Sequence, residues 1–108
     1  MNRGEIWTVA GGAYASKPRP ALIVQDDLFA GTESVTVIPL TGTLVDAPLL
    51  RIRIAAADLS GLDRASDAMI DKLTTVRRTN VQTRIGRVSA SQMVEIERAL
   101  AAFLGLAS

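Results

Sequence analysis

Short runs of β-branched and aliphatic residues, each closed by glycine, proline or polar turn residues, make up most of this chain. Such runs are typical of strands, whereas an ordinary helix needs a periodic pattern over about ten or more residues. The runs occupy residues 6–9, 21–25, 34–38, 50–54, 68–76 and 84–88. The sequence therefore predicts a mainly β fold built from about five or six short strands.

For two of these runs and for one segment between runs, the sequence also predicts where they lie in the fold. Residues 21–25 are continuously apolar, which predicts a central strand buried on both faces. Residues 34–38 alternate, and the Pro39 that follows has no N–H to donate, so this strand is expected to bend or finish near Thr41. Residues 11–20 contain two glycines and two prolines, which predict a mobile surface loop.

The end of the chain differs in kind from the rest. Ser89 and Gln92 have the spacing of a capping box, in which each side chain hydrogen-bonds a free backbone N–H at the start of a helix. Apolar residues then recur at helical spacing at Met93, Ile96, Leu100, Phe103 and Leu104, and Gly105 is a suitable stop. We expect this helix to pack on the β structure within a single domain, residues 1–108.

The chain contains no cysteine and no histidine. Their absence excludes disulfides and the commonest metal ligands, and it leaves Arg, Lys, Asp, Glu, Ser, Thr or Tyr to carry any catalysis. No apolar stretch approaches the roughly 20 residues of a membrane span, and the N-terminus lacks the pattern of a secretory signal. We therefore expect a cytoplasmic protein with no membrane partner.

The formal net charge is only +1, although basic residues exceed acidic ones in the second half of the chain. Six arginines of that half could form a basic surface for a polyanion: Arg51, Arg53, Arg77, Arg78, Arg84 and Arg87. Because the net charge is so small, we favour solvated strand faces for these arginines and keep the polyanion surface as the alternative.

Arg19 is the residue whose local sequence best suits a phosphate. Pro18 and Pro20 hold its backbone extended on both sides, which lowers the entropy lost when the guanidinium is aimed at a ligand. A planar group with five donors matches a phosphate well. Thr41 precedes Gly42 at a strand end, where a hydroxyl could meet a ligand at a close backbone approach. Local sequence alone also fits two ordinary turn residues, and it favours that alternative.

Four other residues have weaker local patterns. Tyr14 could stack on an unpaired base, since aromatic side chains bind splayed-out nucleotides. Trp7, within the first strand, is expected in the core instead. Asp71 and Lys72 fall in the predicted strand 68–76, and by themselves they indicate a surface ion pair.

Four segments, in this order, resemble the MazF/PemK family of toxins. They are RGEIW at residues 3–7, KPRPALIVQDD at residues 17–27, VIPLT at residues 37–41 and RIGRVS at residues 84–89. The resemblance implies an SH3-like barrel of the CcdB/MazF type with a C-terminal helix. It also implies a homodimer whose subunits form an RNA groove, and an acidic antitoxin whose disordered tail wraps the toxin and occupies that groove.

The resemblance also implies roles for individual residues. Arg19 matches the catalytic arginine of the family and Thr41 its catalytic threonine, which act together at the scissile phosphate of RNA. The RNA 2′-hydroxyl attacks there and leaves a 2′,3′-cyclic phosphate and a 5′-hydroxyl, a reaction that needs no metal or other cofactor. The residues for which RNA contacts are predicted are Tyr14, Lys17, Asp71 and Lys72.

Two segments depart from the family pattern. The loop of residues 11–17 is shorter than in several relatives and lacks the acidic residue that they place there. Residues 74–76 read Thr-Thr-Val where relatives usually have an arginine followed by Thr or Ser and an aliphatic residue. Base readout by the loop is therefore in doubt, and neither change specifies a cleavage motif.

The leading hypothesis is a sequence-specific endoribonuclease toxin that cuts single-stranded RNA. The alternative is a CcdB-like toxin that binds DNA gyrase without hydrolysis, since one fold can serve both functions. A third possibility is a binding module that retains the antitoxin surface and has lost activity. The combination of Arg19 and Thr41 favours the ribonuclease, because a gyrase binder needs neither residue.

Overall fold

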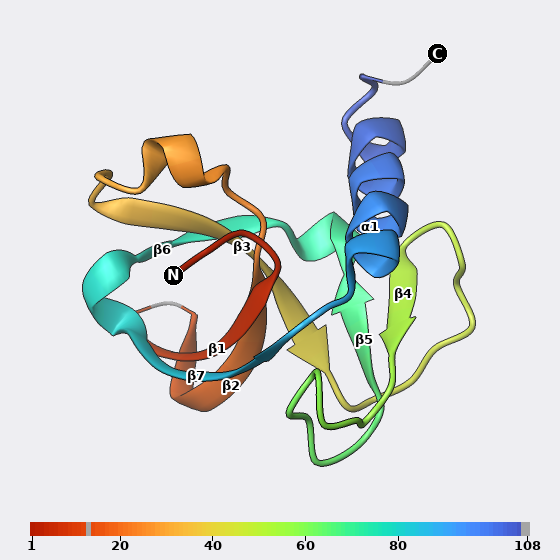
Figure 1. Ribbon diagram of the computed structural model, residues 1–108, viewed down its shortest axis with the longest axis horizontal. Helices are drawn as coiled ribbons and strands as arrows, with labels where there is room; N and C mark the ends of the chain where they lie inside the picture. Colours follow the sequence, from red (N-terminus) through yellow and green to blue (C-terminus); the bar gives the residue numbers. More distant parts are fainter. Residues whose placement is uncertain (13, 107–108) are drawn as a thin grey trace.

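The computed structural model describes residues 1–12 and 14–106. Ala13, inside the predicted loop 11–20, and residues 107–108, at the end of the predicted domain 1–108, lie outside the described residues. Over the described residues the elements are β1 (Glu5–Gly11), β2 (Ala15–Ile23), η1 (Asp27–Phe29), β3 (Ser34–Thr41), β4 (Arg51–Ile54), β5 (Ser66–Met69), η2 (Ile70–Lys72), β6 (Thr74–Arg77), η3 (Arg78–Asn80), β7 (Val81–Arg87) and α1 (Ala90–Phe103) (Figure 1).

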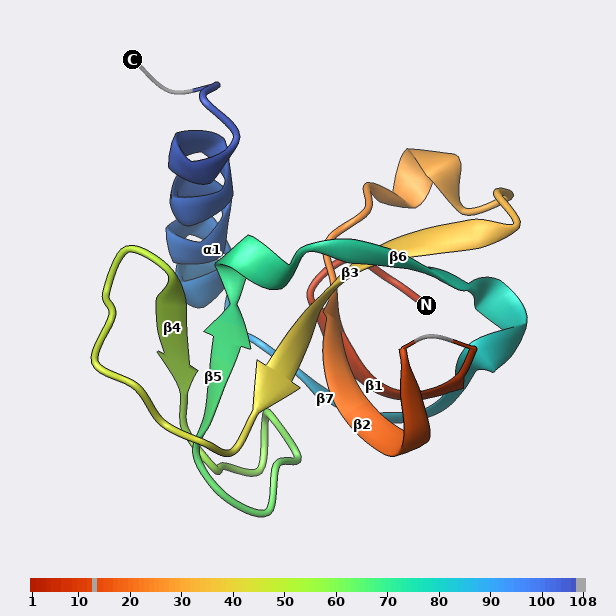
Figure 2. The same ribbon diagram turned by 180° about the vertical axis from the view of Figure 1, so that it is seen from behind.

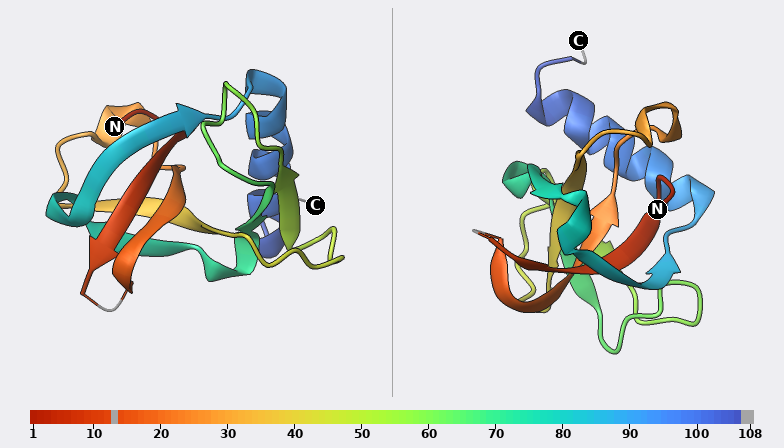
Figure 3. Two further views of the ribbon diagram at one scale, coloured as in Figure 1. Left: turned by 90° about the horizontal axis from the view of Figure 1, so that it is seen from below. Right: turned by 90° about the vertical axis from the view of Figure 1, so that its left-hand side faces the viewer.

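The strands form one antiparallel sheet in the order β4-β5-β3-β2-β1-β7, and β6 pairs with the first half of β3. The sheet is strongly bent. One half, with β1, β2, β6 and β7, curls around its own interior, while β4 and β5 stand to one side with α1 next to them (Figures 2 and 3). The prediction of a mainly β fold with a C-terminal helix is confirmed.

The strand β3 belongs to both halves of the sheet. Its first half pairs with β6, and its last two residues pair with β5. The carbonyl of Thr36 accepts from the N–H of Val24 at 3.3 Å and therefore points toward β2. Backbone groups of successive residues in a strand point to alternate sides, so the nitrogen of Pro39, three residues later, points to the side of β6 and β5. On that side the pairing with β6 ends at Val37 and the pairing with β5 begins at Leu40, so Pro39 lies between the two ladders and its missing N–H costs no hydrogen bond. The bend predicted at Pro39 is thus a change of partner, and the strand ends at Thr41 as predicted.

The prediction of one continuous strand over residues 68–76 is wrong. β5 ends at Met69, the 3₁₀ helix η2 follows, and β6 begins at Thr74. The register against β3 shifts by three residues between β6 and β5, which equals the length of η2. The chain leaves the ladder where Pro39 offers no donor, and a 3₁₀ turn accommodates the three extra residues.

The prediction of a loop over residues 11–20 is wrong for most of its length, because β2 begins at Ala15. Strand alternation points the nitrogens of Pro18 and Pro20 to the edge of β2 that faces away from β1. β3 pairs with β2 only from Ala21 onward, so this edge is open and the prolines cost no ladder bond.

Two clusters of buried apolar side chains fill the fold. The barrel core lies inside the curled half and contains Val9, Ala21, Ile23, Val35, Val37 and Val76. The helix core lies between the sheet and α1 and includes Ile6, Leu22, Ile38, Ile54, Ile70, Met93 and Ile96. Successive residues of β2 enter different clusters, which confirms the prediction of a strand buried on both faces. Trp7 packs against the edge of the barrel core and is only partly buried, so it belongs to the core in part.

The helix α1 begins where predicted. The hydroxyl of Ser89 accepts from the N–H of Gln92 at 3.1 Å. The side-chain amide of Gln92 donates instead to the carbonyl of Arg53 at 2.8 Å, so only half of the capping box forms and the helix is fastened to β4. Phe103 and Leu104 are half exposed, and the predicted apolar face does not extend to them.

Candidate active site

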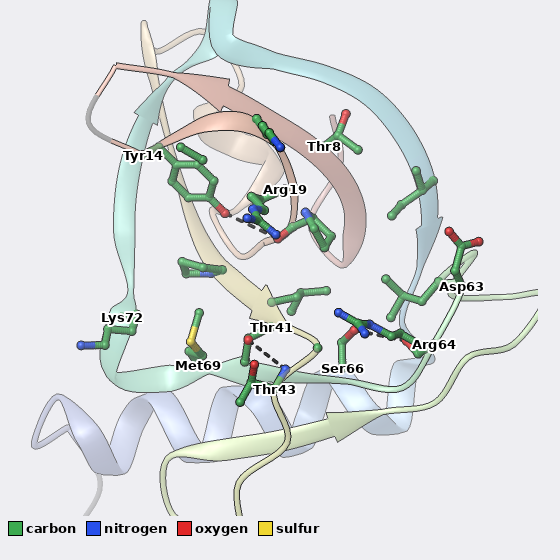
Figure 4. A pocket seen from close by; sticks show the side chains of 18 of the residues that line it. Thr8, Tyr14, Arg19, Thr41, Thr43, Asp63, Arg64, Ser66, Met69 and Lys72 are labelled. Carbon is green, nitrogen blue, oxygen red and sulfur yellow. Dashed lines mark hydrogen bonds between the residues drawn. The ribbon is translucent and has the colours of Figure 1, made fainter.

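An open cleft of about 1100 Å³ lies between the first half of β2 and the end of β3. One side of its lining comes from β1, β2 and the turn between them, with Thr8, Tyr14, Lys17 and Arg19. The other side comes from the end of β3 and the turn after it, with Thr41, Gly42 and Thr43, and from the segment before β5, with Asp63 and Arg64 (Figure 4). Met69 of β5 and Lys72 of η2 complete this side. The cleft therefore brings together five of the six residues predicted from the sequence.

Arg19 lies on one wall of the cleft. The ladder between β1 and β2 fixes its backbone opposite Val9. Its side chain is exposed, and its guanidinium takes part in none of the ion pairs found among residues 1–12 and 14–106. No ion pair within the described residues therefore competes with a ligand for its five donors.

Thr41 faces Arg19 from the other wall (Figure 4). It is the last residue of β3, and its backbone pairs with Asp67 of β5. The hydroxyl oxygen of Thr41 accepts from the N–H of Thr43 at 3.1 Å, which folds the chain back after the strand. Because the oxygen already accepts this bond, its own proton is free to be donated into the cleft.

Asp67 holds the turn after Thr41 in place. Its carboxylate is buried and accepts from the N–H of Val45 at 3.0 Å and from Nε of Arg53 at 2.7 Å. Burial raises the pKa of Asp67, but these hydrogen bonds and the charges of Arg53 and Arg51 outweigh it, so the pKa lies below its ordinary value. No role for Asp67 follows from the sequence, because a single acid in a short strand carries no local signal.

The cleft is cationic, although the chain as a whole is nearly neutral. Arg19 lies on one wall, and Arg64 and Lys72 lie along the other (Figure 4). Lys17 also lines the cleft and belongs to β2, as Arg19 does. In the part of the lining that the structure describes, Asp63 is the only carboxylate. Four cations facing one carboxylate attract a polyanion to this side of the molecule.

Tyr14 lies at the rim of the cleft. Part of its ring packs against the barrel core, and its hydroxyl makes a long contact of 3.5 Å with the carbonyl of Pro20. Burial raises the pKa of Tyr14 to about 12, so the phenol is neutral at physiological pH. Tyr14 is partly buried and lines the cleft, and the stacking of a base on it stays a prediction.

Asp71 and Lys72 point in different directions from η2. Lys72 lines the cleft, whereas Asp71 pairs with Arg51 of β4 and is not part of the lining. The hydrogen bond from Arg51 is the main reason that the pKa of Asp71 lies below its ordinary value. The interpretation of these two residues as an ion pair on a strand is wrong, because they lie on a 3₁₀ turn and the partner of the acid is Arg51.

The six arginines considered as an alternative polyanion surface do not line the cleft, as far as the described residues define it. Four of them hydrogen-bond within the protein: Arg51 with Asp71, Arg53 with Asp67, Arg78 with Thr32 and Arg84 with Glu5. Exposed strand positions hold four of the six, Arg53, Arg77, Arg84 and Arg87, whereas Arg51 is partly buried and Arg78 lies on η3, so the prediction of solvated strand faces fits only part of this group.

Sequence reasoning missed Arg64 completely. This residue lies in the irregular connection between β4 and β5, where the sequence shows no periodicity and no stiffening prolines. Only the tertiary fold brings it to the cleft. No local signal in the sequence could have found it.

Residues 1–12 and 14–106 contain no group of three or more acidic, histidine or cysteine side chains that could hold a metal ion. The helices in this same part of the chain are all too short or too polar to cross a membrane.

Arg19 and Thr41 present complementary groups for a phosphate from opposite walls of the cleft. The guanidinium supplies charge and paired donors, and the hydroxyl supplies one directed hydrogen bond. Both stabilise a phosphate that gains negative charge during a reaction. The fold and the cleft thus define a small β protein equipped to bind the backbone of a nucleic acid.

The chain belongs to the PemK-like, MazF-like toxins of type II toxin–antitoxin systems, whose family model matches residues 2–104. The "Probable endoribonuclease MazF" of Mycolicibacterium smegmatis is 54% identical over 108 residues, which cover 99% of both chains. "Endoribonuclease MazF9" of Mycobacterium tuberculosis is 30% identical over 116 residues, which cover 98% of both chains. The resemblance noted from four short segments is confirmed.

A solved structure supports the same fold. The "Endoribonuclease in complex with its cognate antitoxin from Mycobacterial species" matches with a TM-score of 0.82 and 25% identity, over 100% of this chain and 98% of that chain. The fold class expected from the resemblance is therefore confirmed.

Proposed function

We propose that this chain is an endoribonuclease toxin that cleaves single-stranded RNA, mainly mRNA, at a short sequence motif and without a metal ion. One observation carries the proposal: across a single cationic cleft, the free guanidinium of Arg19 faces the hydroxyl of Thr41, whose oxygen is already held in place. Two relatives, 54% and 30% identical, have endoribonuclease in their names, which supports the same activity.

The reaction is an intramolecular transfer. The ribose 2′-oxygen attacks the adjacent phosphorus, so a P–O2′ bond forms and the P–O5′ bond breaks. The products are a 2′,3′-cyclic phosphate and a 5′-hydroxyl, and the proton lost at the 2′-oxygen is balanced by one gained at the 5′-oxygen. Because the nucleophile is part of the substrate, the protein mainly has to supply orientation and charge stabilisation.

Arg19 and Thr41 divide this task. A guanidinium stays protonated in proteins, so Arg19 is assigned to stabilising the negative charge of the pentacoordinate phosphorane rather than to moving protons. Thr41 donates its free proton to a non-bridging oxygen of the same phosphate. The turn that Thr43 and Thr41 form fixes this donor before the RNA binds.

RNA contacts away from the scissile phosphate are assigned to Tyr14, Lys17 and Lys72, which line the same cleft. The two lysines would contact backbone phosphates, which give affinity without sequence preference. Asp71 lies outside the lining and is held by Arg51, and its contact with RNA stays a prediction.

We also infer two protein partners. An acidic antitoxin segment with a disordered tail fits the cleft, because its carboxylates would meet four cations, and a structure 25% identical in sequence was solved with its cognate antitoxin. The second partner is another copy of this chain, in a homodimer whose subunits form the RNA groove together. Because mRNA is the substrate, we place the protein in the cytoplasm.

The experiment that tests the proposal is incubation of the purified protein with a long single-stranded RNA in EDTA. Primer extension then maps new ends, and kinase labelling identifies 5′-hydroxyls. We expect discrete cuts with 5′-hydroxyl ends and complete loss of cutting in Arg19→Ala. Intact RNA with a folded wild-type protein would reject the ribonuclease and move the assignment to a toxin that binds gyrase. Normal cutting by a folded Arg19→Ala protein would reject the assigned site.

A further inference from the structure

Arg64 occupies a place in the cleft for which the proposed function has no role. Its guanidinium lies so close to Gly42 that a β-carbon there would come within 2.5 Å of Nε and Nη2. Gly42 directly follows Thr41, so this second guanidinium packs against the turn that leaves Thr41, on the same side of the cleft (Figure 4). The ion pairs found among the described residues do not include Arg64. No ion pair within the described residues therefore competes with a ligand in the cleft for its donors.

The segment that carries Arg64 is firmly held. The buried hydroxyl of Ser60 donates to the carbonyl of Ala55 at 2.7 Å and accepts from the N–H of Leu62 at 3.3 Å. The same segment packs against β7 so closely that a β-carbon on Gly86 would lie 2.1 Å from the carbonyl oxygen of Ser60. A side chain on such a segment loses little additional backbone freedom when it binds a ligand.

We propose that Arg64 binds a second phosphate of the RNA, next to the phosphate held by Arg19 and Thr41. This inference rests on the proposed function. Contact with a neighbouring phosphate fixes the register of the strand and strengthens its binding, but it does not change during the chemical step. Gly42 has a matching role, because only the absence of a side chain there lets the guanidinium pack against the turn that follows Thr41.

The first test is Arg64→Ala, measured with a probe that binds without being cut. The probe is an RNA oligonucleotide that carries the mapped cleavage site with 2′-deoxyribose at the attacking position. We expect its dissociation constant to rise about 10- to 100-fold, as for loss of a charge-assisted contact. The slope of log K against log salt concentration should become shallower by about 0.7, the value for one phosphate contact on a single strand.

Cleavage kinetics separate this role from a role at the scissile phosphate. Arg64→Ala should raise KM by a similar factor and leave kcat within about threefold of the wild type. The matched control is Arg98→Ala, which removes an exposed arginine on α1 that does not line the cleft. This control should leave affinity, salt slope and kinetics unchanged.

The second test uses Gly42→Ala, which keeps Arg64 but fills the space that its guanidinium occupies. Since the new β-carbon would meet the end of a flexible side chain, the arginine is expected to move and the fold to persist. Gly42→Ala should weaken binding about as much as Arg64→Ala does, and the double variant should be no weaker than either by more than about twofold, because both remove one contact.

Three results would overturn the inference. They are an unchanged affinity and salt slope in Arg64→Ala, a loss of kcat with KM unchanged, and additive losses in the double variant. The kinetic result requires a wild type that cuts RNA, and the binding probe carries a site that wild-type cleavage has mapped. Failure of this inference is therefore distinct from failure of the proposed function, which would leave the wild type without cleavage.

Discussion

Replacing Thr41 by valine removes a hydroxyl and leaves nearly the same volume at the end of β3. The lost group donates to the scissile phosphate in the proposed reaction. Removing one donor of this kind costs about 2.7–4 kcal/mol of transition-state stabilisation in a well-studied protease. We therefore expect kcat of Thr41→Val to fall about 10²- to 10³-fold.

The folded protein should lose much less. The oxygen of Thr41 accepts one hydrogen bond, from the N–H of Thr43, at a position where water can replace it. The free energy of unfolding should therefore fall by about 0.5–1 kcal/mol, which lowers Tm by about 2–8 °C in a chain of this size. KM should stay within about threefold, because the donor acts in the transition state rather than in the bound substrate.

The assay is single-turnover cleavage of a short RNA with a mapped site, with the protein in excess, together with a thermal melt followed by circular dichroism. Thr41→Ser is the matched control, because it keeps a hydroxyl that can accept from Thr43 and donate to the phosphate. We expect it to retain at least about a tenth of the wild-type rate. A folded Thr41→Val protein that cleaves at the wild-type rate would refute the reasoning and make Thr41 a turn residue only.

The remaining predictions concern stability. The pKa of Asp67 is lower in the folded chain than in the unfolded chain, so its contribution to the free energy of unfolding is present above about pH 4 and is lost as the pH falls further. Asp67→Asn should weaken this acid dependence in urea unfolding between about pH 3 and pH 6, and an unchanged dependence would contradict the assignment. Ser89→Ala should cost about 1 kcal/mol through loss of the helix cap, with Tm as the readout. Gly86→Ala should lower the free energy of unfolding by at least about 2 kcal/mol, because its β-carbon would meet a backbone carbonyl. Its control, Gly31→Ala, has open space around the new β-carbon and should be neutral or slightly stabilising. Equal effects of the two variants on Tm would refute the close approach at Gly86.

The sequence was sufficient for features that depend on neighbouring residues. The cap at Ser89 and the start of α1 follow from a spacing of three residues, and the buried strand after Pro20 follows from a continuous apolar run. Arg19 and Thr41 were found through the resemblance, and the structure places both in one cleft. Their local sequence alone favoured ordinary turn residues.

Features that depend on which strands pair could not be predicted from sequence alone. The two prolines beside Arg19 suggested a loop, and they fit a strand only because one edge of β2 is open. The 3₁₀ turn at Asp71 and Lys72 arises from a shift of register against β3, which no local pattern encodes. Arg64 reaches the cleft through the packing of its segment on β7 and was missed for the same reason.

The open edge of β2 has a consequence for the kind of polymer that can occupy the cleft. An exposed strand edge normally offers N–H donors with which another peptide can pair and extend the sheet. Pro18 and Pro20 remove two successive donors from this edge. Only carbonyl acceptors are left at these two positions, so a peptide cannot form a complete ladder there, and an acidic antitoxin tail would depend more on its side chains. RNA binds through phosphates rather than through a strand ladder, so the two missing donors do not weaken its binding, and the cations in the cleft attract its phosphates.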